Sequence, residues 1–330
     1  MKELVRKLVE AYGPSGREEQ VRALIEGLVR PKVDETRTDG LGNLIALRKG
    51  TGGGKRVMIA AHMDEIGLIV TYIDKKGFCR FGTVGGVSTL SVIGSRARFA
   101  NGAVGVIGWE KWFRSGDRPT QEELFLDVGA VPGGQAPVSV GDVAGFDRPF
   151  VDLGQRLVSK AMDDRIGCAV AAQTLLELGP SPHDLYFVFT TQEEVGLRGA
   201  TVSAFGVEPE VGVAIDVTGT GDTPEAHPMA VELGNGPAIK VMDSDALVHP
   251  GVKDWMVQTA QGLGIKYQLE VLEFGGTDAG AMQRSRAGVP AGCLSIPCRY
   301  IHTPSEMVDY GDVQGAVKLL VGMLSKPIAI

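Results

Sequence analysis

Short apolar runs alternate with amphipathic segments along most of the chain. In the N-terminal segment MKELVRKLVEAYG, Leu and Val recur at helical spacing with charges between them, and similar patterns predict helices near residues 18–29, 253–263 and 311–324. Runs of Val, Ile, Ala, Leu and Phe between such segments predict buried strands. The strands are expected at residues 44–47, 56–61, 185–190, 211–215, 267–272 and 292–296.

Most of these predicted strands are apolar along their whole length. Such strands, alternating with helices, are typical of a mostly parallel sheet that is buried on both faces. We therefore expect an α/β fold, with a mostly parallel mixed sheet sandwiched by helices. In sheets of this kind ligands bind beyond the carboxyl ends of the strands, so polar side chains at those ends are candidates for a functional site.

The pattern changes between about Leu68 and Asp152. Runs such as GLIVTYI and SVIGSRARFA alternate there with glycines, which predicts a small β-rich module with one short helix near residues 121–127. The chain has 330 residues, more than most single hydrophobic cores hold. We interpret residues 69–151 as an inserted β-rich domain, PDZ-like or barrel-like, and residues 1–68 with 152–330 as the main domain.

Composition argues against several classes of protein. The formal net charge is −7, the pI is near 5.4 and no basic block occurs, so nucleic acid is not expected as a partner. No apolar run is long enough to span a bilayer, and the first helix does not resemble a signal peptide. The four cysteines contain no C-x-x-C pair, which favours free thiols in a reducing compartment. We expect a cytoplasmic protein without membrane contacts.

Acidic residues and histidines gather where predicted strands end or predicted helices begin. Asp, Glu and His form the ligand set of a hydrolytic metal centre. Because the strand ends meet at one edge of a parallel sheet, the clusters are expected to converge on a shared metal site. They are His62 with Asp64, Asp163 with Asp164, Glu193 with Glu194, Asp216, and His302.

Some of these clusters also have an ordinary structural interpretation. His62 and Asp64 are two residues apart at a strand end, which places both side chains on the same side, but a histidine that closes a loop fits equally well. Asp163 and Asp164 precede a helix, where Asp is favoured as the N-cap. The two roles are compatible, since one carboxylate can bind metal while the other caps the helix.

The pair Glu193 and Glu194 is harder to explain without a metal. Adjacent carboxylates after an apolar strand raise each other's pKa, and a metal would relieve that repulsion for one of them. The other could act as a general base. Asp216 ends the apolar run VGVAID with few basic residues close in sequence, so a metal is again a suitable partner. Mixed nitrogen and oxygen ligands favour zinc, cobalt or manganese, and the number of carboxylates favours two ions.

The ordered motifs H-x-D, D-[DN]-R-x-G, Q-E-E-x-G-x-x-G, A-x-D and H-[TS]-x-x-E resemble those of the tetrahedral-type, glutamyl and deblocking aminopeptidases. These are dinuclear metallopeptidases, and the resemblance covers nearly the whole chain. It implies two divalent ions per subunit, zinc or cobalt, and a dimerisation role for the inserted module. It also implies that dimers assemble into a hollow tetrahedral dodecamer.

The resemblance further implies a role for each candidate residue. Glu193 would be the general base, Asp64 would orient His62, and Asp164 would have a supporting role. The glycine-rich stretch 275–280 would lie near the substrate pocket, with Gly276, Thr277 and Asp278 as substrate-binding residues. The implied metal ligands are His62, Glu194, Asp216 and His302, with Asp163 bridging the two ions.

The activity that follows is removal of the first residue from short peptides, by a water that the metals activate and Glu193 deprotonates. The sequence leaves the preferred first residue open. One alternative is an endoglucanase-type glycoside hydrolase that uses a carboxylate pair such as Glu193 with Asp163, although the chain has only three tryptophans and no aromatic cluster for a sugar cleft. A nucleotide-binding module is disfavoured, because the glycine-rich residues 50–55 precede their strand and Arg56 replaces the required Ser or Thr.

Overall fold

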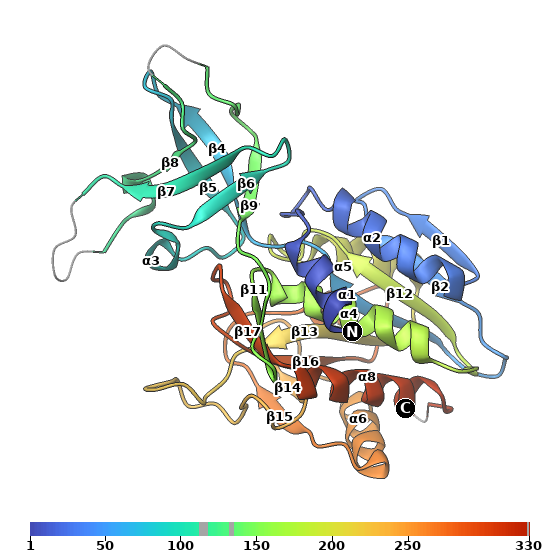
Figure 1. Ribbon diagram of the computed structural model, residues 1–330. Coiled ribbons are helices and arrows are strands. Elements are labelled where there is room, and N and C mark those ends of the chain that lie inside the picture. The colour runs from blue at the N-terminus through green and yellow to red at the C-terminus, as the bar shows by residue number, and fades with distance from the viewer. Residues whose placement is uncertain (112–117, 132–134, 329) are drawn as a thin grey trace.

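The computed structural model describes residues 1–111, 118–131, 135–328 and 330 (Figure 1). These residues form a helix-covered sheet and a smaller barrel beside it. The α/β fold with an inserted β-rich domain, expected from the sequence, is confirmed. Of the two expected forms of the insertion, the structure has the barrel.

The main sheet has 11 strands among the described residues. Its four central strands, β12 (Asp184–Thr190), β3 (Arg56–His62), β13 (Val211–Thr218) and β16 (Ala291–Arg299), run parallel. The strands that flank them along the main path pair antiparallel, whereas the two branch strands pair parallel with each other. In spatial order the strands are β1 (Glu35–Thr38), β2 (Leu44–Arg48), β12 (Asp184–Thr190), β3 (Arg56–His62), β13 (Val211–Thr218), β16 (Ala291–Arg299), β17 (Glu306–Asp309), β11 (Arg156–Ser159) and β10 (Val151–Asp152). Two further strands, β14 (Ala238–Met242) and β15 (Gln268–Val271), branch from β16.

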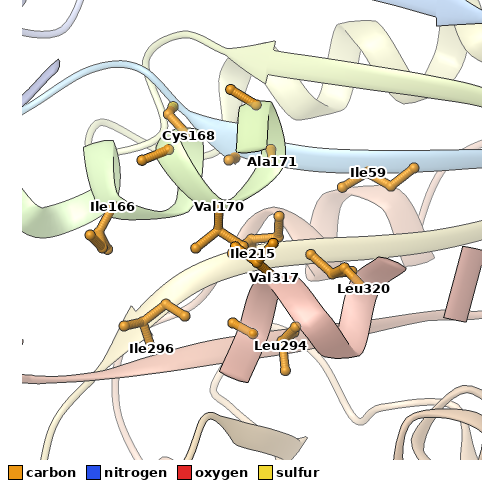
Figure 2. Packing of buried hydrophobic residues seen from close by; sticks show 14 of the residues in the cluster. Ile59, Ile166, Cys168, Val170, Ala171, Ile215, Leu294, Ile296, Val317 and Leu320 are labelled. Carbon is orange, nitrogen blue, oxygen red and sulfur yellow. The ribbon is translucent and has the colours of Figure 1, made fainter. Parts of the chain in front are cut away.

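Helices cover both faces of this sheet. One face carries α1 (Lys2–Glu10), α2 (Glu19–Val29), α4 (Met162–Glu177), α6 (Pro250–Leu263) and α8 (Tyr310–Leu324), with a short 3₁₀ turn, η1 (Arg30–Lys32), after α2. The other carries α5 (Arg198–Val207) and α7 (Asp278–Gln283). Successive side chains of β3 point to opposite faces of the sheet. Ile59 therefore packs in the core under the first set of helices and Met58 in the core under α5 and α7. Figure 2 shows the first core, in which Val170 of α4 and Leu320 of α8 lie near Ile215 and Leu294.

The barrel has its own apolar core, which includes Leu68, Phe81 and Phe146. Its strands close in the order β4 (Gly67–Ile73), β5 (Phe78–Val84), β8 (Leu124–Asp127), β7 (Val104–Trp109), β6 (Arg96–Phe99) and β9 (Val143–Phe146), and a short helix, α3 (Thr89–Val92), lies between β5 and β6. The chain enters and leaves the barrel on paired strands, with Gly67 opposite Gly145. The domain boundaries at residues 69 and 151 stay predictions.

The helix predicted at residues 121–127 is wrong. Only a 3₁₀ turn, η2 (Gln121–Glu123), precedes strand β8. Leu124 and Leu126 are buried whereas Asp127 is exposed, and this alternation suits one face of the barrel wall.

The parallel centre of the sheet positions the candidate residues. β3 ends at His62, and β12 ends three residues before Glu193. Asp216 lies near the end of the adjacent strand β13. The expected convergence at one edge of the sheet is confirmed. Among the described residues, no helix combines the length and the apolar character that crossing a membrane requires.

Candidate metal centre

His62 is buried at the end of β3 and presents one ring nitrogen to a group of carboxylates. Its Nδ1 lies 3.2 Å from the backbone oxygen of Asp64 and 3.4 Å from Asp64 Oδ1. Its Nε2 lies 2.9 Å from Asp163 Oδ1 and 3.9 Å from a carboxylate oxygen of Asp216. A proton on Nδ1, held by Asp64, leaves the Nε2 lone pair free to bind a metal.

Asp163 and Asp164 divide the two roles that their position allows. Neither has helical backbone angles, so the regular part of α4 begins after them. Asp164 accepts hydrogen bonds from the N–H of Gly167 at 3.0 Å and of His62 at 3.3 Å, which makes it the cap. Asp163 points its other oxygen at His302, with Oδ2 3.4 Å from Nε2. Burial would raise the pKa of Asp163, but hydrogen bonds with the two imidazoles outweigh it and lower the pKa.

Glu193 and Glu194 are held in place through their backbone. Asp64, which is fully buried, accepts the N–H of Glu193 on Oδ1 at 3.0 Å and the N–H of Glu194 on Oδ2 at 3.2 Å. Ser15, from the loop between α1 and α2, donates to the same carboxylate at 2.6 Å. Asp64 therefore links the end of β3 to the turn that follows β12.

The two glutamates face the cluster differently. Glu194 Oε2 lies 3.2 Å from His302 Nε2, and Glu194 Oε1 is buried with no hydrogen-bond partner among the residues described. Glu193 Oε2 lies 3.9 Å from His62 Nε2. An unpartnered buried carboxylate oxygen is costly unless a cation or donor meets it, so the position of Glu194 fits a metal ligand.

Glu306 is a member of the site to which the sequence reasoning assigned no role. It is buried and accepts the N–H of Asp163 at 3.0 Å and the N–H of His302 at 2.9 Å. The only signal for it is the glutamate of the motif H-[TS]-x-x-E, four residues after His302. The Glu306 carboxylate thus fixes the backbone of two candidate ligands, Asp163 and His302.

The cluster has more buried negative charge than its two imidazoles neutralise. Burial would lower the pKa of His62, but Glu193 and Asp163 outweigh it and hold the pKa well above its usual value. Burial raises the pKa of Glu193, Glu194 and Asp216, and neighbouring carboxylates add to this rise. Carboxylates in this state favour either protons or a cation, so the donor set fits divalent metal ions.

Two groups of side chains bring candidate ligand atoms within 4.8 Å of one another. They are His62, Asp164 and Asp216, and His62, Asp163 and Glu194. His302, 39% exposed, lies on the open side of the second group. The nitrogen and oxygen donors of these side chains suit zinc or cobalt. Asp164 stands in the first group although its carboxylate caps α4.

A cavity of about 610 Å³ adjoins the cluster and is lined by Asp163, Glu193, Glu194, Asp216 and His302 at one end. Of the predicted substrate-binding residues, Gly276 lines this cavity. Thr277 and Asp278 are buried outside its lining. Thr277 donates to Asp243 at 3.0 Å, and Asp278 accepts from Thr190 at 2.6 Å. Their side chains therefore support the fold around the cavity.

Comparisons with known proteins agree with this geometry. The family model described as M42 glutamyl aminopeptidase matches residues 42–319. A candidate aminopeptidase from Acetivibrio thermocellus is 47% identical over 323 residues, 97% of each chain. The lysyl aminopeptidase of Pyrococcus furiosus is 35% identical over 339 residues, 98% of this chain and 96% of its own.

A solved structure extends the match to three dimensions. Aminopeptidase APDkam598 from the archaeon Desulfurococcus kamchatkensis superimposes with a TM-score of 0.93 at 40% identity, covering 99% of this chain and 94% of its own. The chain therefore belongs to the M42 glutamyl aminopeptidase family and is a peptide hydrolase.

Proposed function

We propose that this protein is a dinuclear metallo-aminopeptidase that removes the first residue from short peptides. The observation that carries the proposal is the position of Asp163, whose two carboxylate oxygens face different imidazoles, those of His62 and His302. A carboxylate so placed is suited to bridge two ions. His62 and Asp216, with Glu194 and His302, would complete the two coordination shells.

Two divalent ions, zinc or cobalt, would supply Lewis acidity at this site: they would lower the pKa of a bound water, polarise the scissile carbonyl and orient the free amine. Glu193 takes the proton from the attacking water and passes it to the leaving amine. It suits this role because it lines the cavity and stands outside both groups of candidate ligands. Asp64 keeps the Glu193 backbone in place and orients His62.

The glycosidase alternative has one supporting resemblance. A Thermotoga maritima structure described as an endoglucanase is 33% identical, with a TM-score of 0.83. A glycosidase pair needs only two carboxylates, whereas here His62 Nε2 faces three carboxylates and His302 Nε2 faces two. That surplus of nitrogen ligands favours the metallopeptidase.

The expected assembly is a dimer that builds a tetrahedral dodecamer, with the barrel domain of residues 69–151 forming the dimer contact. Two related structures support the dodecamer: one described as a dodecamer of PhTET1, 30% identical with a TM-score of 0.88, and a Pyrococcus horikoshii TET1 peptidase described as assembling into a tetrahedron or an octahedral shell, 31% identical with a TM-score of 0.86. Short peptides are the expected substrates and the cytoplasm the expected location.

Chelation tests the function. The purified protein is assayed on free and N-acetylated leucyl peptides and on carboxymethyl cellulose, before and after treatment with a chelator. We expect cleavage of the free peptide alone, loss of that activity on chelation, and recovery when zinc or cobalt is added. Activity that survives complete metal removal, or that requires the polysaccharide, would refute the proposal.

A further inference from the structure

The cavity beside the candidate metal centre extends well beyond the candidate ligands. Its volume of about 610 Å³ lies in the range of small-molecule binding pockets. The rest of its wall comes from the ends of β13 and β16 with the residues that follow them, from the segments after β14 and β15, and from the turn before α5. A substrate with its first residue at the metal centre has to place a side chain against this wall.

The wall is largely apolar. Two of its side chains, Leu197 and Val217, are 8% and 6% exposed, and Phe274 is 63% exposed and therefore lies at the mouth. The apolar side chains that matter here are Leu197, Val217, Met229, Leu272, Phe274 and Ile301. They come from separate segments of the chain, so the apolar part of the wall is not the face of one loop.

Among the described residues that line the cavity, the single arginine is already paired with a carboxylate. Arg299 holds Asp222 with two hydrogen bonds, Nε to Oδ1 at 2.9 Å and Nη2 to Oδ2 at 2.6 Å. Burial would raise the pKa of Asp222, but the bonds from Arg299 and Thr220 outweigh it and lower the pKa to about 2. Arg299 therefore has its charge engaged and is a poor partner for an acidic substrate side chain.

Outside the candidate metal site, the carboxylate of Asp245 and the imidazole of His227 in the wall also have partners. Asp245 lies 3.7 Å from Arg284, and His227 lies 3.7 Å from Glu273. All four side chains are at least 40% exposed, which places them at the solvent edge. Within the described part of the chain, the wall outside the candidate metal site thus offers no buried unpaired charge to a basic or acidic side chain.

We propose that this cavity selects a large, uncharged apolar first residue, such as leucine, methionine or phenylalanine. The inference rests on the proposed aminopeptidase function and assigns its substrate class. A charged side chain entering this wall would lose its hydration without gaining a partner. An apolar side chain would instead bury surface against the wall and gain free energy from that burial.

A substrate panel tests the proposal. The metal-loaded full-length protein is assayed on the p-nitroanilides of Leu, Met, Phe, Ala, Lys and Glu. We expect kcat/KM for Leu, Met and Phe to exceed that for Lys and Glu by about tenfold or more, because a charged side chain would lose its hydration in this wall without gaining a partner. Preference for Lys or Glu would overturn the inference alone, whereas no hydrolysis of any anilide would overturn the proposed function with it.

A pair of variants tests whether this wall makes the selection. Leu272 lines the cavity, and Leu269, three residues earlier, is 49% exposed and lies outside it. Leu272→Glu is expected to lower kcat/KM for the Leu substrate by about tenfold and to raise the Lys-to-Leu ratio, while Leu269→Glu keeps both values. Metal content and the unfolding transition are measured for both variants. Folded, metal-loaded Leu272→Glu protein with unchanged preference would contradict the assignment.

A second panel separates the first residue of the substrate from the second. Dipeptides of the form Leu-Xaa vary the leaving side, and Xaa-Leu varies the first side chain. We expect kcat/KM to vary more across the Xaa-Leu series. The opposite order would show that the cavity takes the leaving residue and would overturn the proposal.

Discussion

The buried carboxylate of Asp64 accepts a hydrogen bond from the backbone N–H of Glu193 at 3.0 Å. Asp64→Asn replaces one acceptor oxygen with a donor, so this contact and the one to the following N–H cannot both persist. We expect kcat to fall by about 10- to 100-fold, as for other groups that orient metal ligands. The measurement is kcat together with the far-UV spectrum and metal content.

Asp74→Asn provides the matched control. Asp74 also accepts two backbone N–H groups, from Lys76 at 2.8 Å and Phe78 at 3.0 Å, but in a turn of the barrel. Its substitution should leave kcat unchanged. An equal loss in both variants would show that Asp64 acts only through general stability.

Glu193→Gln tests the general base. The amide keeps the shape of the side chain but cannot take a proton, so we expect kcat to fall by about 10²- to 10⁴-fold. Metal content, measured by elemental analysis, should stay at the wild-type level because Glu193 is outside both ligand groups. Near-normal turnover would remove Glu193 from the mechanism.

Asp163→Ala and His302→Ala test the shared carboxylate. Asp163 faces both imidazoles, whereas the imidazole of His302 faces Asp163 and Glu194. We expect Asp163→Ala to lower the binding of both ions and His302→Ala to spare one of them. Titration of the metal-free variants with zinc, followed by calorimetry, gives the number of ions bound. Equal stoichiometry in the two variants would argue against a bridging role.

Lys160→Met tests the buried ion cluster beneath the barrel junction. Lys160 is 5% exposed and Glu65 2% exposed, and Nζ lies 2.8 and 2.7 Å from the two carboxylate oxygens. Removing one partner of a buried pair destabilises by about 3–5 kcal/mol. The lower end is expected here, since Arg165 remains 3.3 Å from Glu65. The free energy of unfolding in urea is the measurement.

Lys2→Met is the surface counterpart of this change. Lys2 pairs with Asp152 at 2.9 Å, and the two side chains are 33% and 42% exposed. Because solvent screens such pairs, the loss should stay below about 1 kcal/mol. A loss equal to that of Lys160→Met would mean that burial does not set the difference.

Local patterns suffice for part of the site. His62 and Asp216 each lie near the end of an apolar run, and parallel packing brings such ends together. That one of Asp163 and Asp164 caps the helix while the other is available to a metal also follows from sequence, because only one carboxylate is needed as the N-cap.

The remaining features depend on contacts between distant segments. Ser15 reaches Asp64 from another loop, and Glu306 reaches two backbone N–H groups across the end of the sheet. The hydrophobic periodicity of a sequence carries no information about such contacts. Thr277 was expected at the substrate but is bonded to Asp243, since a glycine-rich stretch does not reveal which side its polar groups face.

The chain leaves the main domain for the barrel and returns to it at neighbouring positions, since Gly67 pairs with Gly145. An inserted domain whose two ends are adjacent can be accommodated without distorting the domain that carries it. Such insertions are therefore well tolerated. Here the host strands on either side keep their order without passing through the barrel. We therefore expect most of the barrel to tolerate change without disturbing the sheet, except at Gly85 and Gly86 after β5, where an added Cβ would lie 3.1 Å from Glu194 Cβ and 2.6 Å from His302 Nδ1.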